Sequence, residues 1–405
     1  MSYRRILIYS ETQTAAATMQ IRLVGPLSQR GFELVDAHEF LHSSNQPLQK
    51  LAQSFDAVVV HRGIRKRCPL YPLLISAARE QQVPVILDID DLLFRVPRSH
   101  PDFAVYQSRT AQALKVLLDA DTVVASTPPL AENLAAFHSS VVVIPNELPS
   151  SLWGEICRQK QAECSRSTAD RITIGYIGSG THRPDLQSIE EVLLTVLRRH
   201  RNRVRFLSVG VPLSPRLSRE PNVEQIKPSK RIAHSYSEFV QFAASLPIEI
   251  GIAPLLDNLF NCCKSNAKFQ EYAALGIAGV YSDLPTYHVG VRHGENGFVA
   301  KTPAQWEWSL EQLVTASDLR IQLAQTAALD LQTNWRLAKA GELWNETLAL
   351  AKTRAQQRTA SSAHSIAAIV DDLIEYQAGL ERQLKKSVRY QASKIISRLM
   401  RKWAA

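Results

Sequence analysis

Short apolar runs alternate with helical patterns along most of this chain, and this alternation constrains the fold more than any other feature. The first series begins with an apolar run at 5–9 and ends with one at 141–144. After a polar stretch, the rhythm restarts at 172–177 and continues to about residue 330. Strand–helix alternation is typical of open parallel sheets with helices on both faces. The sequence therefore predicts an α/β fold with two Rossmann-like units in tandem, which face a cleft.

The chain is also too long for one hydrophobic core. Its 405 residues favour two domains. We predict an N-terminal Rossmann-like domain at 1–150, a linker at 151–170, a C-terminal Rossmann-like domain at 171–330, a late helix at 331–353, and a polar linker with a basic tail at 354–405. No apolar run is long enough to span a bilayer, and the cysteines lack zinc-type spacing. With no signal-peptide core after the first strand, a reduced cytoplasmic protein is expected.

The net charge of +9 is concentrated in the tail. Residues 376–405 hold eight Lys or Arg and one acid, so they carry +7 of the total. Apolar residues recur at helical spacing from 380 to 403, which predicts a basic amphipathic helix. Such a helix binds an anionic membrane surface, packs on the body or a partner chain, or binds nucleic acid. We expect peripheral membrane contact and no nucleic acid, because no nucleic-acid-binding motif is present.

The stretch 261–283 indicates an anion site. It reads as a basic turn, an amphipathic helix and a buried strand, with Lys264 near the helix N-terminus and Lys268 one turn further on. Cations beside free backbone N–H groups favour phosphate. Glu271 lies on the same helix face as Lys268 and is placed to accept hydrogen bonds from ribose hydroxyls. The alternative is a solvated amphipathic helix with a salt bridge.

A glycine-rich turn supports the same interpretation. The run I-T-I-G-Y-I-G-S-G-T-H-R-P-D-L at 172–186 places glycines and hydroxyls directly after a strand. Glycines let the backbone approach a phosphate, and hydroxyls add donors. The alternative is an ordinary strand-to-helix turn. The residues that we expect to contact a phosphate are Gly178, Ser179, Gly180, Thr181 and His182.

Three carboxylates, Asp88, Asp90 and Asp91, follow another apolar strand. Because they repel one another, a metal ion, solvent or arginines such as Arg62 must compensate their charge. The pattern also resembles the nucleophile strand of Asp-dependent phosphatases. Helix-start capping is a further alternative.

Together these motifs resemble GT-B-fold glycosyltransferases of family 4, in particular bacterial members that make surface polysaccharides, including rhamnosyltransferase-like proteins. The resemblance covers roughly 3–344 and is carried by 174–186, by I-G-I-A-P-L-L-D-N-L-F-N-C-C-K-S-N-A-K-F-Q-E-Y-A-A-L-G at 250–276, and by G-E-N-G-F-V at 294–299. It implies that the C-terminal domain binds a nucleotide sugar, that the N-terminal domain binds the acceptor, and that the late helix crosses back to the first domain.

The resemblance also implies residue roles. Glu271 matches the second glutamate of an E-x7-E motif, which grips the ribose, and Lys264 matches the lysine that neutralises the diphosphate. Cys263 stands where the first glutamate is usual, and Asp90 stands where many members have a histidine. The N-terminal loop lacks the common double glycine, and Arg22 is an anion contact there.

The predicted function is therefore retaining, hexosyl-type transfer from a nucleotide diphosphate sugar to a saccharide or lipid-linked acceptor, with no metal or other cofactor. The alternatives are a catalytically inactive nucleotide-binding scaffold, a nucleotide-sugar epimerase and the Asp-dependent phosphatase. The predicted catalytic residues are Asp90, Asp88 and Lys264; the donor-binding residues are Gly178, Ser179, Gly180, Thr181, His182, Lys264, Ser265, Lys268 and Glu271; the acceptor-side residues are Arg22, Arg62 and Asp91.

Overall fold

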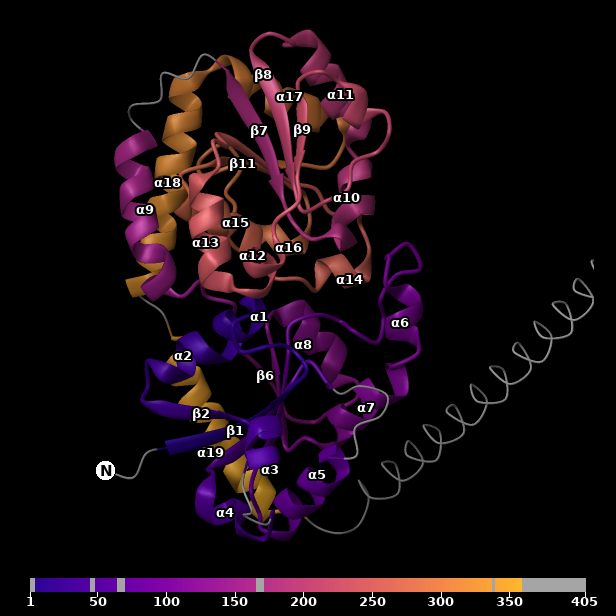
Figure 1. The fold of residues 1–405 in the computed structure, drawn as a ribbon, viewed down its shortest axis with the longest axis vertical. Coiled ribbons are helices and arrows are strands. Elements are labelled where there is room, and N and C mark those ends of the chain that lie inside the picture. The colour runs from indigo at the N-terminus through magenta and orange to yellow at the C-terminus, as the bar shows by residue number, and fades with distance from the viewer. Residues whose placement is uncertain (1–3, 44–47, 64–69, 165–170, 337–338, 359–405) are drawn as a thin grey trace, which may run out of the picture.

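A computed structural model describes residues 4–43, 48–63, 70–164, 171–336 and 339–358. Each half of the chain forms a parallel six-stranded sheet. Figure 1 shows the two halves end to end, with the first half below and the second above. The predicted α/β fold with two Rossmann-like units is confirmed. The predicted basic helix at 380–403 lies outside the described residues.

The first sheet has the strand order β2-β1-β3-β4-β5-β6. Along β4, Leu87 and Ile89 belong to a buried cluster on one face, and Ile86 belongs to a cluster on the other. Both faces are covered, which explains why the inner strands are continuous apolar runs. The strands are β1 (Arg4–Ser10), β2 (Phe32–Asp36), β3 (Ala57–His61), β4 (Val85–Ile89), β5 (Thr122–Ala125) and β6 (Val141–Val143). The helices are α1 (Ala17–Met19), η1 (Gln20–Val24), α2 (Gly25–Ser28), α3 (Ala37–Ser43), η2 (Leu48–Lys50), α4 (Leu51–Ser54), α5 (Leu70–Glu80), α6 (Phe103–Gln107), α7 (Thr110–Asp119) and α8 (Pro128–Ala135).

The second sheet repeats this plan with the order β12-β11-β10-β7-β8-β9. Its strands are β7 (Ile172–Ile177), β8 (Val204–Val209), β9 (Val223–Ile226), β10 (Ile250–Ala253), β11 (Ala278–Ser282) and β12 (Phe298–Ala300). Its helices are η3 (Gly180–His182), α10 (Arg183–Gln187), α11 (Glu190–Arg199), η4 (Leu217–Arg219), α12 (Lys230–His234), α13 (Tyr236–Ser245), α14 (Leu259–Cys262), α15 (Ala267–Ala274), α16 (Pro285–His288), α17 (Pro303–Thr315) and α18 (Ser317–Arg336).

Three strands were not expected from the apolar pattern: β2, β9 and β12. All three lie at sheet edges, where one side of the strand has no neighbour. β9 reads V-E-Q-I, and its two central side chains are exposed. Edge strands tolerate polar residues and short lengths, so they leave no apolar run to detect.

The segment between the sheets also differs from expectation. The sequence predicts a polar linker at 151–170 with at most a short helix around Gln159, but the longer α9 (Ser150–Cys164) occupies most of it. Trp153 and Cys157 on this helix are fully buried, in the same cluster as Leu331 of α18. Figure 1 shows α9 and α18 side by side on the second domain. Few apolar residues suffice here because only one narrow face of α9 is covered.

The last described helix returns to the first domain. α18 extends to Arg336, and α19 (Ala340–Gln356) then packs behind the first sheet, as Figure 1 shows. Trp344 of α19 is fully buried, and its Nε1 donates a hydrogen bond to the backbone oxygen of Arg22 at 3.1 Å. The C-terminal end of the described chain is thereby fixed to the first domain rather than the second.

A buried ion pair lies at the centre of the first domain. Arg22 and Asp88 are 1% and 0% exposed, and their side chains are 2.6 Å apart. The other oxygen of Asp88 contacts Nδ1 of His61 at 2.8 Å, and Arg22 also donates to the Ile144 backbone oxygen. Asp88, predicted as a catalytic group, and Arg22, predicted as an acceptor-side contact, are thus both enclosed in the domain. They pair with each other, and each has a further partner in the domain.

The charge of Asp88 depends on these partners. Burial alone would raise the pKa of the Asp88 carboxyl, but the Arg22 guanidinium and His61 outweigh it and hold the pKa below its usual range. A carboxyl whose pKa is depressed on folding stabilises the protein at neutral pH, and this contribution is lost as the pH falls through the folded-state pKa. The ion pair is therefore intact at neutral pH.

Among the described helices, none is both long and apolar enough to cross a membrane.

Replacing Asp88 by Asn tests the importance of this pair. The change leaves the Arg22 charge buried without its counter-ion, so we expect the free energy of unfolding to fall by about 3–5 kcal/mol. Urea unfolding followed by circular dichroism measures it. Asp102→Asn, at an exposed carboxylate on the same domain, is the matched control and should stay within about 0.5 kcal/mol of wild type. A loss below about 1 kcal/mol for Asp88→Asn would contradict a structural role.

Candidate functional site

The two domains meet where their strands end. Asp91 follows β4, Thr127 follows β5 and Asn146 follows β6, and each contacts a residue just after α14. In open parallel sheets, ligands bind outside the carboxyl ends of the strands. The residues at this junction, which we call the strand-end junction, therefore form the candidate site.

The glycine-rich turn after β7 packs closely against the backbone at Gly210. Gly210, which follows β8, has a φ of +80°, and a β-carbon there would lie 2.1 Å from the Gly178 backbone oxygen. Only glycine fits this position. Within the turn, Ser179 and Gly180 are exposed, and the Ser179 and Thr181 hydroxyls are 2.6 Å apart. The turn thus presents backbone and hydroxyls at the junction.

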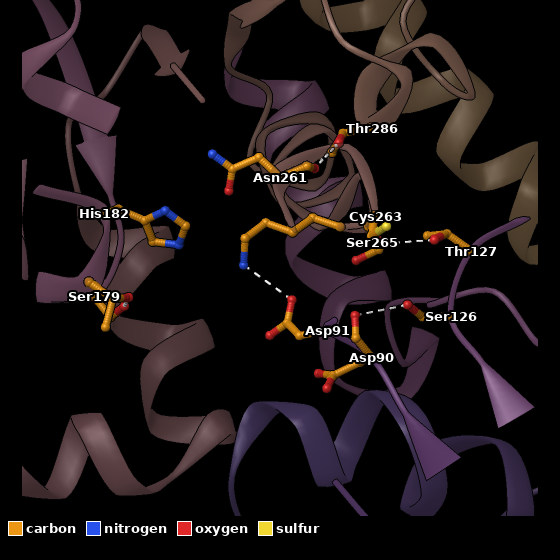
Figure 2. A network of polar contacts seen from close by, with 12 residues as sticks. Asp90, Asp91, Ser126, Thr127, Ser179, His182, Asn261, Cys263, Ser265 and Thr286 are labelled. Atoms are coloured by element: carbon orange, nitrogen blue, oxygen red, sulfur yellow. Dashed lines mark hydrogen bonds and ion pairs between the residues drawn. The ribbon is translucent and has the colours of Figure 1, made fainter. Parts of the chain in front are cut away.

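His182 is oriented by a buried carboxylate. Its Nδ1 lies 2.9 Å from Asp185, whose other oxygen accepts hydrogen bonds from the Leu256 backbone N–H at 2.9 Å and the Asn261 side chain at 3.1 Å. Asp185 therefore ties the turn after β7 to the loop after β10. Figure 2 shows His182 and Ser179 facing Asp91 across the same space.

Lys264 makes an ion pair across the two domains. Its Nζ lies 3.1 Å from Asp91 and 4.4 Å from the centre of the Phe260 ring. Burial alone would raise the pKa of the Asp91 carboxyl, but Lys264 and then Arg62 hold it well below its usual range. Asp91 is therefore ionised at neutral pH and pairs with two cations.

Arg62 organises the acidic cluster after β4. Its guanidinium donates to Asp90 and to Asp91, each at 3.0 Å. Burial alone would lower the pKa of Arg62, but the two carboxylates raise it above its ordinary value. Arg62 also has a φ of +63°, a conformation that non-glycine residues seldom adopt. Arginines therefore compensate the three aspartates: Arg22 pairs with Asp88, and Arg62 pairs with the other two.

Asp90 has one free oxygen. Its Oδ2 pairs with Arg62 and its backbone oxygen accepts from Ser126 at 3.0 Å, while the buried Oδ1 has no partner among the described residues. A buried polar atom without a partner costs about 1–3 kcal/mol. Asp90 therefore offers an unused acceptor at the strand-end junction.

Lys268 and Glu271 lie together on α15. Their side chains are 2.7 Å apart, and Glu271 is only 9% exposed. The salt bridge of the alternative interpretation is therefore present, on a helix face that is largely buried rather than solvated. The side chain of Asn266 does not cap the helix. Ser265, just before α15, accepts a hydrogen bond from Asn146 of the first domain at 2.8 Å.

Cys263 points away from these lysines. Its side chain is fully buried in the core cluster of the first domain, together with Phe260. Its backbone oxygen accepts a hydrogen bond from Thr127 at 2.8 Å, which Figure 2 also shows. Burial raises the pKa of the Cys263 thiol to about 11, so the thiol is neutral at physiological pH. Cys263 acts here as an apolar contact between domains.

A pocket of about 420 Å³ opens on the first domain beside Arg62. Its wall includes Glu11, Thr12, His61 and Tyr106. No group of three or more His, Cys, Asp or Glu within the described part of the chain is arranged to hold a metal ion.

Several residues at the junction were not identified from the sequence: His61, Asn146, Asp185, Gly210 and Asn261. Two of them could have been noticed in the sequence. His61 is the last residue of an apolar strand and Gly210 directly follows one, and parallel sheets place ligand contacts at such strand ends. Asp185 and Asn261 act by bonding residues far along the chain, which only the folded structure reveals.

No protein-family model matches the sequence, and no curated protein matches it significantly. Solved structures do match. HepE from Anabaena, in complex with UDP and glucose, has a TM-score of 0.57 at 13% identity, covering 86% of this chain and 99% of that one. A glycosyltransferase from Rickettsia africae scores 0.56 at 12% identity, covering 87% and 99%. A UDP-forming α,α-trehalose-phosphate synthase from Burkholderia xenovorans, in complex with glucose-6-phosphate, scores 0.54 at 12% identity, covering 85% and 100%.

The likeness extends over at least 85% of this chain in all three cases. The chain therefore has the GT-B fold of nucleotide-sugar glycosyltransferases.

Proposed function

We propose that this protein is a glycosyltransferase that moves a sugar from a nucleotide diphosphate sugar to a saccharide or lipid-linked acceptor. The observation that carries the proposal is the position of Lys264, Lys268 and Glu271. They lie at the strand ends of the second domain, next to the exposed turn after β7. The structural neighbours that hold UDP or UDP-glucose share this fold.

The donor nucleotide would bind on the second domain. Backbone N–H groups and hydroxyls of 178–181 would contact the diphosphate, with His182 beside them. Lys264 would exchange its present partner, Asp91, for a phosphate. Glu271, held by Lys268, would accept hydrogen bonds from the ribose hydroxyls.

The chemistry follows from this charge distribution. When the bond between the sugar carbon and the phosphate oxygen breaks, its electron pair stays on the diphosphate. Lys264, Lys268 and the backbone N–H groups would stabilise that charge, which is electrostatic catalysis. The acceptor hydroxyl forms the new bond to the sugar carbon and releases its proton. We assign no metal to this step, because the lysines supply the positive charge.

The acceptor would bind on the first domain. The free Oδ1 of Asp90 and the pocket beside Arg62 are the groups available there. Asp90 would contact the transferred sugar or the attacking hydroxyl. Asp91 and Arg62 would position Asp90 and neutralise one another.

Three further features of the proposal rest on the sequence resemblance. They are hexosyl transfer with retention, family 4 membership and a role in bacterial surface polysaccharide synthesis. A cytoplasmic enzyme that contacts the membrane through 380–403 would meet lipid-linked acceptors at that surface.

A second candidate is a nucleotide-binding scaffold without transfer activity. It is favoured by one observation: Cys263 stands where a glutamate would contact the donor sugar, and its side chain is buried in the first domain instead. Nucleotide binding without sugar transfer to any acceptor would identify this function.

A thermal-shift panel tests the donor site. UDP, GDP, dTDP and CDP are added without metal to wild type and to Lys264→Ala. A ligand that binds only the folded protein raises its melting temperature. We expect one nucleotide to do so, with affinity about 10- to 100-fold weaker in Lys264→Ala, because a charge-assisted contact is lost. Lys301→Ala, at an exposed lysine of the same domain, is the control and should match wild type. Equal changes in melting temperature in all three proteins would show that Lys264 does not contact the nucleotide.

Asp91→Asn tests whether Asp91 competes with the donor. Asp91 pairs with Lys264 in the structure, so a diphosphate must displace it and bind near its charge. We expect the Asn variant to bind the same nucleotide up to about tenfold more tightly, as measured by calorimetry. Weaker binding in Asp91→Asn would show that Asp91 contacts the donor directly.

A further inference from the structure

A pocket of about 470 Å³ opens on the second domain, away from the strand-end junction. Its wall includes Arg171 just before β7, Arg205 in β8 and Glu249 just before β10. Parallel strands all begin at one edge of a sheet and end at the other. The glycine-rich turn follows the end of β7, and a strand of six residues such as β7 spans about 20 Å. The pocket is therefore a separate cavity from the candidate donor site.

Cations outnumber acids in the wall of this pocket. The wall holds four cations and two acids, namely Lys160, Arg171, Arg205, Arg320, Glu163 and Glu249. Lys160 pairs with Glu163 at 2.8 Å. Arg320 lies 3.8 Å from Glu249. The wall therefore has two positive charges in excess, and they belong to Arg171 and Arg205.

Arg171 and Arg205 contact only neutral groups within the described part of the chain. Nε of Arg205 donates a hydrogen bond to the Thr173 hydroxyl at 2.9 Å, and Arg171 donates to the Arg201 backbone oxygen at 3.3 Å. Arg205 pairs in register with Thr173, so the two arginines lie on neighbouring strands. Arg171 is exposed and Arg205 is half-buried, so both have surface that a ligand can contact. Each guanidinium has five N–H donors in a planar fork that matches a carboxylate or a phosphate.

The surface beside the pocket is also basic. From the end of α11 into β8 the chain reads R-R-H-R-N-R-V-R at 198–205. Arg198 and Arg199 pair with glutamates. The exposed Arg201 and Arg203 have no carboxylate partner in the ranges that the structure describes. A surface lined by one sign of charge raises the local concentration of the opposite ion, so this surface would attract an anion toward the pocket.

Apolar side chains from three segments line the rest of the wall. Among them are Leu246 after α13, Leu275 after α15 and Ile321 on α18. The side chains of Leu246 and Ile321 are partly exposed. Small-molecule sites have volumes of roughly 300–1,000 Å³ and are mostly apolar, with a few charged groups that fix orientation. This wall therefore fits an anion that is attached to an apolar body better than it fits an inorganic ion.

We infer that this pocket binds a small organic anion, a carboxylate or a phosphate monoester on an apolar body, with the anionic group between Arg171 and Arg205. The site is distinct from the donor and acceptor sites, and the inference does not depend on the proposed function. A concave pocket of this size encloses a small molecule, whereas a membrane or a protein surface would contact only the arginines at its edge.

A matched pair of fluorescent probes tests the charge requirement. Anilinonaphthalenesulfonate and N-phenylnaphthylamine share one apolar body, but only the first is an anion. Both fluoresce more strongly in an apolar site, so the full chain is titrated with each. We expect wild type to bind the sulfonate at least about tenfold more tightly than the neutral probe. In the double variant Arg171→Gln/Arg205→Gln, the sulfonate should bind about tenfold more weakly or worse, with the neutral probe unchanged.

A second variant reverses the charge without removing an arginine. Ile321→Glu places a carboxylate in the pocket wall, at a partly exposed position where little packing is lost. It should also lose sulfonate binding, because the new carboxylate pairs with the arginines and repels the probe. Arg219→Gln, at an exposed arginine outside the wall, is the control and should bind as wild type. Thermal unfolding followed by circular dichroism checks that each variant is folded.

Competition identifies the anionic group. Hexanoate, hexyl phosphate, hexanol and inorganic phosphate are each added to wild type with the sulfonate bound. We expect hexanoate or hexyl phosphate to displace the probe at concentrations at least about tenfold lower than hexanol or inorganic phosphate requires. The more effective of the two then indicates whether the pocket prefers a carboxylate or a phosphate monoester.

The inference is wrong if wild type binds both probes equally, or if both pocket variants bind the sulfonate as wild type does. It is also wrong if the arginine variant loses binding to phosphatidylglycerol vesicles but keeps binding to the sulfonate, since the arginines would then contact a membrane. The nucleotide that raises the melting temperature should not displace the sulfonate, and it should raise the melting temperature of both pocket variants as it does that of wild type. Displacement by that nucleotide would place the probe in the donor site and overturn the inference, with the proposed function unaffected.

Discussion

Charge compensation at the ends of two parallel sheets is the constraint on which the rest of this structure depends. Asp88, Asp90 and Asp91 lie at the carboxyl end of the single strand β4, where their charges would repel one another. Arg22 neutralises Asp88 inside the domain, and Arg62 forms ion pairs with both Asp90 and Asp91. The remaining cation, Lys264, comes from the second domain and pairs with Asp91. Charge balance in one domain is thus completed by the other.

This arrangement links the observed ion pairs to the proposed activity. Lys264 is held at the junction by a carboxylate that a diphosphate can replace, so the site is already charged and oriented before the donor binds. Phe260, within α14, and Cys263, directly after it, are buried in the core of the first domain and keep the domains close. In the proposed function, donor binding would therefore exchange one anion for another rather than create a new site.

The sequence predicts the elements better than the contacts between them. Lys264, Lys268 and Glu271 could be identified because they lie within one short helix pattern. The two Rossmann-like units could be identified because inner strands are buried on both faces. The Arg22–Asp88 pair could not, since the two residues are 66 positions apart and meet only through the sheet order. The edge strand β9 was missed because half of its side chains are exposed. His61 was missed because a histidine after three valines reads as the end of an ordinary strand.

A crystal structure with the nucleoside diphosphate that raises the melting temperature tests the central claim most directly. The account predicts electron density for the ribose within hydrogen-bond distance of Glu271, and for the terminal phosphate beside Lys264 and the backbone of 178–181, with Asp91 released from Lys264. A nucleotide bound elsewhere, or one bound while the Lys264–Asp91 pair and the Lys268–Glu271 pair stay unchanged and without contact to it, would contradict the account.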